Sequence, residues 1–375
     1  LGKINSNSKK IEELFFEKVN ELRLLENTIK IITDANFSQL YRENEPAFCY
    51  YFGSSDGNFK NIDLVTKLIK DATPILPIFK ESFSIEIPKN LENYNGQKYD
   101  STKDSKIVNL ALESFGKLRH SRKVFISYMR NESTSVAIQL YEVLEGNNFD
   151  VFLDTHSIKQ GELFQEELWH RMTDCDVIVM LNTPSFMTSR WCKEELAEAS
   201  AKQIGILQVI WPNHQLESVS HICKPIYLKG DDFHGSIYSS RMVNEMANRI
   251  VHETESLRAR NLAARQDNLI TEFTATANKY GKLLSLQPER FLTEDLGGNK
   301  KRIFIPTVGI PQSIDCNQSE ELRKEINEFD IESIHLIFDD IRISEKWLRH
   351  LDWLNNFLEV KTLKKQHFDI WLQKN

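Results

Sequence analysis

The stretch Val124-Phe125-Ile126-Ser127-Tyr128 decides how the middle of this chain folds. It is an almost continuous apolar run, and the basic pair Arg122-Lys123 precedes it. A short apolar run with a polar flank is typical of a strand that is buried on both faces, as in a parallel sheet. We therefore predict that this stretch is the first strand of such a sheet.

Strand-like and helix-like runs alternate after this opening strand. Further strands are predicted at 150–153, 177–181 and 205–211, and helices at 135–145, 164–173 and 192–202. Parallel strands joined by helices require right-handed crossovers, and four of them give a doubly wound sheet. The central part of the chain is therefore expected to have an α/β fold.

The N-terminal part shows a similar but shorter alternation. Helices are predicted at 8–25 and 62–69, and strands at 28–32, 47–52 and 74–79. Strands that alternate with helices indicate a parallel α/β layer. The glycine-containing loop 53–57 follows a strand but lacks the spacing of a phosphate-binding loop, so we interpret it as an ordinary turn. A helix is also expected at 107–118, before the basic connector 119–123.

The C-terminal part begins with a long helical pattern. Residues 237–280 contain no proline, their apolar residues recur at helical spacing, and their charged residues, such as Arg258 and Arg265, are expected on a solvated face. Strands at 302–308 and 333–338 and helices at 319–327 and 344–357 then predict a small α/β core. We divide the chain into an N-terminal α/β module (1–118), a central domain (119–235), a long connecting helix (236–282) and a C-terminal α/β module (283–375).

Composition narrows the classes of function. The net charge of −7 over 375 residues disfavours nucleic-acid binding as the main role, because phosphate neutralisation needs a surplus of Lys and Arg. Apolar runs are too short for a membrane span or a signal peptide, which favours a cytoplasmic location. The chain opens at Leu1 rather than at methionine, so the sequence leaves open whether both natural termini are present.

Metal and disulfide chemistry have little support in the residue pattern. The five cysteines are scattered without a C-x-x-C pair, and the ten histidines form no H-E-x-x-H motif. We therefore expect reduced thiols, no metal site and no cofactor.

Four segments of the central domain resemble the TIR (Toll/interleukin-1 receptor) family, in the expected order. They are Phe125-Ile126-Ser127-Tyr128-Met129-Arg130-Asn131, then Phe152-Leu153-Asp154 with Ile158 and Gly161, then 174–181 (DCDVIVML), and 189–196 (SRWCKEEL). The last resembles the S-x-W-C-x-x-E-L signature of plant TIR domains. The resemblance covers less than a third of the chain and implies a flavodoxin-like fold with a parallel sheet, here flanked by the smaller α/β modules and the long helix.

The resemblance implies that Glu195 is a catalytic residue. In TIR enzymes the catalytic glutamate follows the signature tryptophan by four residues, here Trp191. Positions i and i+4 share a face of a helix, whereas Glu194 is turned about 100° away. The alternative for Glu195 is a solvated carboxylate on a helix surface.

Further residues are expected to bind the substrate. By resemblance, the loops at the carboxyl ends of the strands line the cleft, and the candidates are Ser127, Tyr128, Arg130, Asp154, Ser185, Phe186 and Trp191. Arg130 suits a bidentate clamp on pyrophosphate, and the face of Trp191 suits a cationic ring. The BB loop is expected at Thr155, His156, Ser157, Ile158, Lys159, Gln160 and Gly161.

These residues imply an NAD+-consuming enzyme, a glycohydrolase or cyclase that breaks the bond between nicotinamide and ribose. NAD+ is then a substrate, and the residues do not distinguish ADP-ribose from a cyclic ADP-ribose isomer as product. The alternative is a non-catalytic TIR scaffold that self-associates through its BB loop. The flanking modules suggest a bacterial antiviral, innate-immune effector or signal generator, controlled by oligomerisation or by an activating ligand or partner protein.

Overall fold

The computed structural model describes most of the chain. The described residues are 1–21, 29–42, 47–71, 73–115, 121–153, 164–186, 204–214, 223–287, 290–326 and 328–375. Contacts divide the chain into two compact units, Leu1–His120 and Ser121–Asn375, which are treated separately below. The finer division into four parts remains a prediction.

The N-terminal unit contains a three-stranded parallel sheet in the order β1-β2-β3. Its strands are β1 (Cys49–Phe52), β2 (Ile75–Phe79) and β3 (Gln97–Lys98), and its helices are α1 (Ser6–Glu21), α2 (Phe37–Leu40), α3 (Ile62–Lys70), α4 (Phe83–Glu86) and α5 (Asp104–Ser114). The predicted parallel layer is confirmed. The strand predicted at 28–32 is wrong for residues 29–32, which lie outside any strand.

The second unit begins with a five-stranded sheet in the order β5-β4-β6-β7-β8, in which every pairing is parallel. The strands are β4 (Lys123–Ser127), β5 (Asp150–Leu153), β6 (Val177–Asn182), β7 (Gly205–Ile210) and β8 (Cys223–Tyr227). The four predicted strands are confirmed. The edge strand β8 was not predicted, because Lys224 and Pro225 interrupt its apolar pattern.

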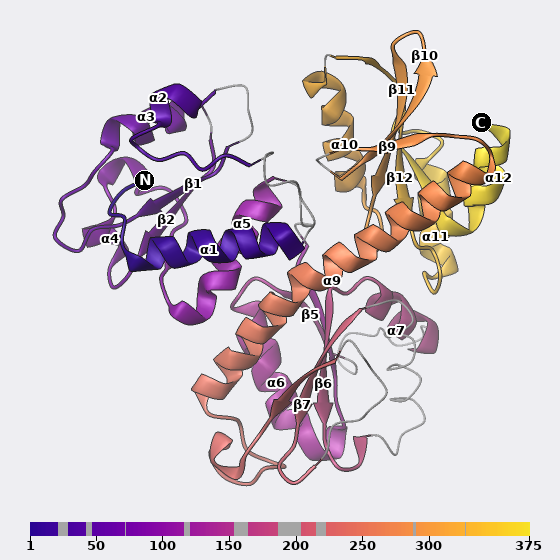
Figure 1. Cartoon of the computed structure of the whole chain (residues 1–375). Coiled ribbons are helices and arrows are strands. Elements are labelled where there is room, and N and C mark those ends of the chain that lie inside the picture. Colours follow the sequence, from indigo (N-terminus) through magenta and orange to yellow (C-terminus); the bar gives the residue numbers. More distant parts are fainter. Residues whose placement is uncertain are drawn as a thin grey trace. The chain divides into compact units, whose positions relative to one another are not determined.

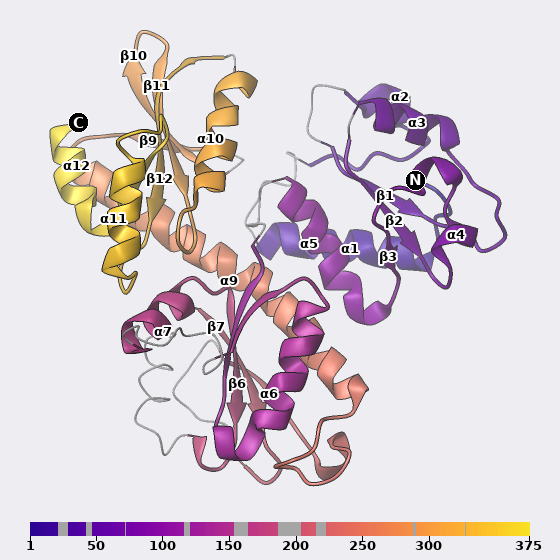
Figure 2. The same ribbon diagram turned by 180° about the vertical axis from the view of Figure 1, so that it is seen from behind.

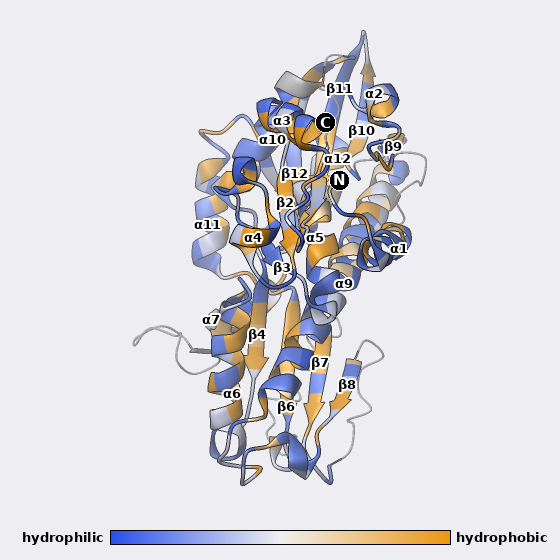
Figure 3. Cartoon of the chain, turned by 90° about the vertical axis from the view of Figure 1, so that its left-hand side faces the viewer, coloured by the Kyte–Doolittle hydropathy of each residue, from blue (hydrophilic) through white to orange (hydrophobic). Residues whose placement is uncertain are grey.

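Helices cover both faces of this sheet (Figures 1 and 2). Helices α6 (Arg130–Glu145) and α9 (Asn244–Lys279) contribute buried side chains to one core cluster, and α7 (Phe164–Thr173) contributes to the cluster on the opposite face. Because both faces are buried, β6 and β7 are buried at every position. Figure 3 shows the resulting hydrophobic colour of β4, β6 and β7. The helix predicted at 192–202 lies outside the described residues.

Helix α9 belongs to two cores. Ile250 and Leu257, in its first half, are buried with the residues of the five-stranded sheet, whereas Phe273 and Ala277 are buried with those of a second sheet. Its 36 residues span about 54 Å at 1.5 Å per residue. Neither α9 nor any other helix in the described ranges has the combination of length and hydropathy needed to cross a membrane.

The second sheet also has five strands, in the order β13-β12-β11-β10-β9. Its elements are β9 (Leu284–Leu286), β10 (Leu292–Gly297), β11 (Lys300–Pro306), α10 (Ser313–Glu325), β12 (Asp330–Phe338), α11 (Glu345–Leu354), β13 (Lys361–Lys364) and α12 (Phe368–Lys374). Gly297, the last residue of β10, and Gly298, in the turn before β11, both have positive φ, 80° and 62°. This sheet is larger than the two strands predicted from the sequence.

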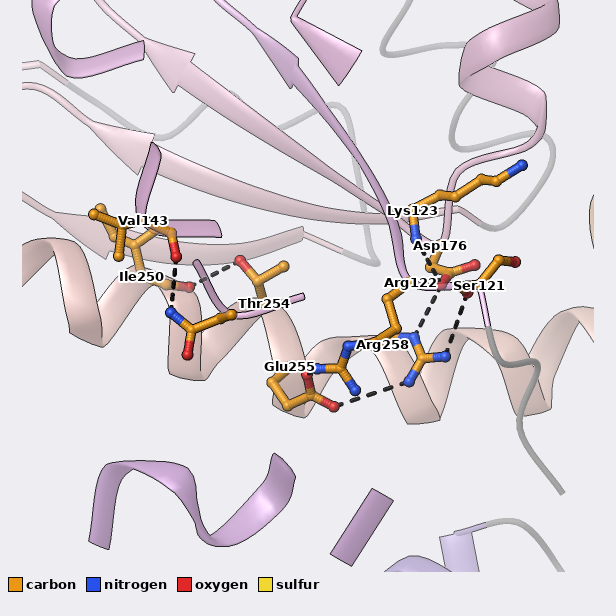
Figure 4. A network of polar contacts seen from close by, with 10 residues as sticks. Ser121, Arg122, Lys123, Val143, Asp176, Ile250, Thr254, Glu255 and Arg258 are labelled. Carbon is orange, nitrogen blue, oxygen red and sulfur yellow. Dashed lines mark hydrogen bonds and ion pairs between the residues drawn. The ribbon is translucent and has the colours of Figure 1, made fainter. Parts of the chain in front are cut away.

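A buried ion pair connects α9 to the first sheet (Figure 4). Arg258 Nε donates to Asp176 Oδ2 at 2.9 Å, and both side chains are 0% exposed. Asp176 precedes β6 and also accepts a hydrogen bond from the Lys123 amide at 3.2 Å. Arg122 pairs with Glu255 nearby. The expectation that Arg258 lies on a solvated face is therefore wrong: the arginine pairs with a buried carboxylate that the spacing along the helix could not indicate.

Helix α11 and the loops before α10 and α11, which belong to the second sheet's part of the chain, contact α7 and the residue that follows it. The His170 and Trp347 rings stack with centroids 5.7 Å apart, and the Ser344 amide donates to His170 Nδ1 at 3.3 Å. The Ile310 amide donates to Asp174 Oδ1 at 3.0 Å, just after α7. His170 is buried because α11 and the loop before it cover its ring.

We predict that Arg258→Met destabilises the protein by about 3 kcal/mol, because it leaves the Asp176 carboxylate buried without its cation. Chemical denaturation would measure the free energy of unfolding. Arg249→Met is the matched control: Arg249 is exposed on the same helix, and its replacement should change stability by no more than about 0.5 kcal/mol. Equal effects of the two substitutions would contradict the importance of the pair.

Candidate functional site

The carboxyl ends of β4, β6 and β7 meet at one edge of the first sheet. Ser127, the last residue of β4, lies beside Met180 of β6, and Asn182 at the end of β6 lies beside Ile210 at the end of β7. In open α/β sheets, ligands bind outside this edge, in loops that follow the strands. Polar side chains in these loops are therefore the candidates for function.

Asn182 is the centre of one polar chain at this edge. Its side-chain amide donates to Gln208 Oε1 at 3.1 Å, and its Oδ1 lies 3.1 Å from His214 Nε2. Asn182 and Gln208 are both 0% exposed, and Gln208 donates in turn to Cys223 Sγ at 2.9 Å. This chain runs from the carboxyl end of β6 through Gln208 of β7 to Cys223, the first residue of β8, and each buried polar group finds a partner on the next strand.

Glu132, in the first turn of α6, reaches the turn that follows β6. Its Oε2 accepts a hydrogen bond from the Ser185 amide at 3.1 Å. The turn itself is closed by the Phe186 amide, which donates to the Thr183 carbonyl at 3.0 Å. A carboxylate on one helix therefore holds the loop that leads away from a neighbouring strand.

The environment keeps Glu132 ionised. Partial burial by itself raises the pKa of its carboxyl, but the hydrogen bond from Ser185 and the nearby Thr183 and His214 side chains outweigh that effect and lower the pKa below its ordinary value. The edge thus carries a fixed negative charge at neutral pH. A fixed charge of this sign can hold hydrogen-bond donors and favours cationic groups near it.

The described residues predicted to bind substrate differ in exposure. Ser127, Tyr128 and Phe186 are buried, with exposed fractions of 2%, 6% and 0%. Ser185 is half-buried, and Arg130 is exposed at the start of α6. The structure thus brings Arg130 and Ser185 to the accessible edge and places the other three beneath it.

The remaining predicted site residues lie outside the described part of the chain. They are Asp154, Trp191, Glu195 and the whole predicted BB loop, Thr155–Gly161. Their roles therefore remain predictions from the sequence.

The open parallel sheet, helices on both faces and polar groups at the carboxyl edge define an α/β domain built to hold a ligand in its loops. Residues 124–233 match the family model of the TIR domain. This part of the chain is a TIR domain of the bacterial kind.

The comparisons add one relative and one structure. The chain is 27% identical over 129 residues to the "2' cyclic ADP-D-ribose synthase BtTIR" of Bacteroides thetaiotaomicron, a match that spans 34% of this chain and 44% of that protein. A crystal structure of MurF from Acinetobacter baumannii aligns over 96% of this chain and 98% of its own, with 8% identity and a TM-score of 0.18.

Sequence reasoning missed Glu132, Asn182 and His214. Asn182 ends β6, and Glu132 and His214 lie in the segments that follow β4 and β7. Their position after predicted strands was therefore a usable signal. The hydrogen bonds that these residues form could not be predicted, because bonds between residues about 30 to 50 positions apart depend on the strand order.

We predict that Asn182→Ala destabilises the protein by about 1–3 kcal/mol, because it leaves the buried Gln208 side chain without this partner. The free energy of unfolding measured in urea would test this. Asn356→Ala is the control, since Asn356 is exposed just after α11 and its side-chain amide donates to the Asp352 carbonyl four residues before it. A loss no larger than that of the control would show that the polar chain contributes nothing.

Proposed function

We propose that the TIR domain cleaves the bond between nicotinamide and ribose in NAD+. The observation that carries the proposal is the TIR domain at 124–233, in which Glu195 follows Trp191 by four residues. The relative from Bacteroides thetaiotaomicron, whose name describes a cyclic ADP-ribose synthase, supports chemistry of this type.

The chemistry explains why one carboxylate suffices. Positive charge develops on the ribose as the bond breaks, while nicotinamide starts as a cation and departs neutral. No general acid has to protonate it, which distinguishes the reaction from ordinary glycoside hydrolysis with its two carboxyl groups. In our proposal, Glu195 stabilises the cationic transition state and accepts hydrogen bonds from the ribose hydroxyls.

The accessible edge of the sheet supplies the rest of the proposed site. Arg130 is exposed at the start of α6, where its guanidinium can bind the pyrophosphate in a bidentate manner. Ser185 and Asp154 contact the nucleotide, and Trp191 stacks on the nicotinamide. Since Ser127, Tyr128 and Phe186 are buried, we assign them to the floor of the cleft rather than to direct contacts.

The product depends on which nucleophile reaches the ribose carbon. Water gives ADP-ribose, whereas an adenine nitrogen or a ribose hydroxyl of the same molecule gives a cyclic isomer. The name of the relative favours the cyclic product. In either case the chain acts as an effector or signal generator in bacterial defence, working as an assembly of TIR domains that a ligand or partner protein activates.

A second candidate function is that of a scaffold. Self-association through the BB loop would then be the whole activity, as the TIR match alone is compatible with binding without catalysis. The glutamate at position 195 favours the enzyme, because a scaffold does not require a carboxylate there.

We predict that the purified chain releases nicotinamide from NAD+ and that Glu195→Ala lowers the rate at least about a hundredfold, since it removes the charge that stabilises the transition state. Nicotinamide would be followed by chromatography at high protein concentration, which promotes assembly. Glu194→Ala is the matched control and should stay within about threefold of the native chain. If the native chain and both variants were inert while self-association persisted, the scaffold would be the function.

A further inference from the structure

We propose that Glu132 is a positioning residue for the nicotinamide–ribose end of the substrate, acting through the turn 183–186. This inference rests on the proposed function and deepens it. Glu132 itself does not contact the substrate in this account. It holds Ser185, which is half-buried beside the exposed Pro184, in the place that we propose for the ribose.

Glu132 contacts the turn 183–186 through its carboxylate, which accepts a hydrogen bond. Oε2 accepts the Ser185 amide at 3.1 Å, and the nearby Ser185 and Thr183 side chains help to lower the pKa of the carboxyl. An ionised carboxylate accepts several hydrogen bonds and donates none. It is therefore matched to a turn that presents the Ser185 backbone N–H toward it.

The backbone of α6 holds Glu132 in a defined place. The amides of Glu132 and Ser133 both donate to the Met129 carbonyl at 3.0 Å. Ser133 departs from helical geometry, with φ of −144° and ψ of 16°, so the first turn of α6 is offset from the rest of the helix. The Ser133 hydroxyl donates to the same carbonyl at 3.1 Å. This irregular turn follows β4 directly, so Glu132 links the end of β4 to the loop after β6.

The contact between Glu132 and Ser185 matters because the turn 183–186 comes just before the segment that contains Glu195. The turn ends at Phe186, whose side chain is fully buried in the core under the sheet edge. Residues 187–203 follow, and they include Trp191 and Glu195. Phe186, anchored below, and Ser185, held from the side, are thus the last described residues before the segment that carries the proposed catalytic residue.

A glutamine at position 132 is the informative replacement. It keeps the size of the side chain but has one carbonyl oxygen in place of two acceptors, and its NH2 group would face the donors of the turn. The turn would then shift by a fraction of an ångström or more, and errors of this size in a substrate-orienting group cost about ten- to a hundredfold in rate.

The test is the kinetics of nicotinamide release against NAD+ concentration for the full chain and for Glu132→Gln. We expect kcat/KM to fall at least about tenfold and KM to rise about fivefold, because a displaced Ser185 binds the ribose less well. A variant that is only partly unfolded would lose kcat alone, since its folded molecules keep the native KM. Glu142→Gln is the matched control: Glu142 lies on the same helix, is exposed and pairs with Arg241, so its KM and kcat should equal the native values.

A double-mutant cycle identifies the route. If Glu132 acts through Ser185, then Glu132→Gln combined with Ser185→Ala should be no worse than about twofold below Glu132→Gln alone. A KM of Glu132→Gln within twofold of the native value, or losses that multiply in the double variant, would overturn the inference while leaving the NAD+ cleavage intact. A native chain that releases no nicotinamide would overturn the proposed function and this inference together.

Discussion

The second unit depends on one buried ion pair, Arg258 with Asp176. Two charges at 0% exposure are costly to bury, and each is compensated by the other and by further hydrogen bonds. The pair joins the middle of α9 to the amino end of β6. Because the far half of α9 enters the core of the second sheet, the same contact that completes the TIR domain also sets the direction in which the C-terminal module is attached.

The opposite edge of the TIR sheet holds the candidate site, and there the carboxylates have different roles. Glu132 is engaged by the turn after β6 and has a lowered pKa, whereas Glu195 is proposed to face the substrate. Helix α7 follows the predicted BB loop in the sequence, and its His170 ring stacks on the Trp347 ring of α11. The C-terminal module thus contacts the helix next to the loop through which TIR domains are proposed to associate.

The sequence predicted the parts of the fold that have strong periodicity. The strand at 150–153 and the helix at 164–173 have the predicted bounds, and the strand at 177–181 is longer by one residue. It missed β8, where proline and lysine mask the pattern, and it misjudged Arg258, whose partner lies 82 positions away. At the site, resemblance supplied Glu195, but the link between Glu132 and Ser185 depends on which strands become neighbours, and local pattern carries no such information.

The most direct test of the central claim is a crystal structure of the native chain with a carbocyclic NAD+ analogue that cannot be cleaved. The account predicts that the analogue binds at the carboxyl edge of β4 and β6. Its pyrophosphate should contact Arg130, and its nicotinamide-bearing ring should lie beside Ser185 within hydrogen-bonding distance of the Glu195 carboxylate. An analogue bound elsewhere on the chain, or with Glu195 turned away from the ring, would contradict it.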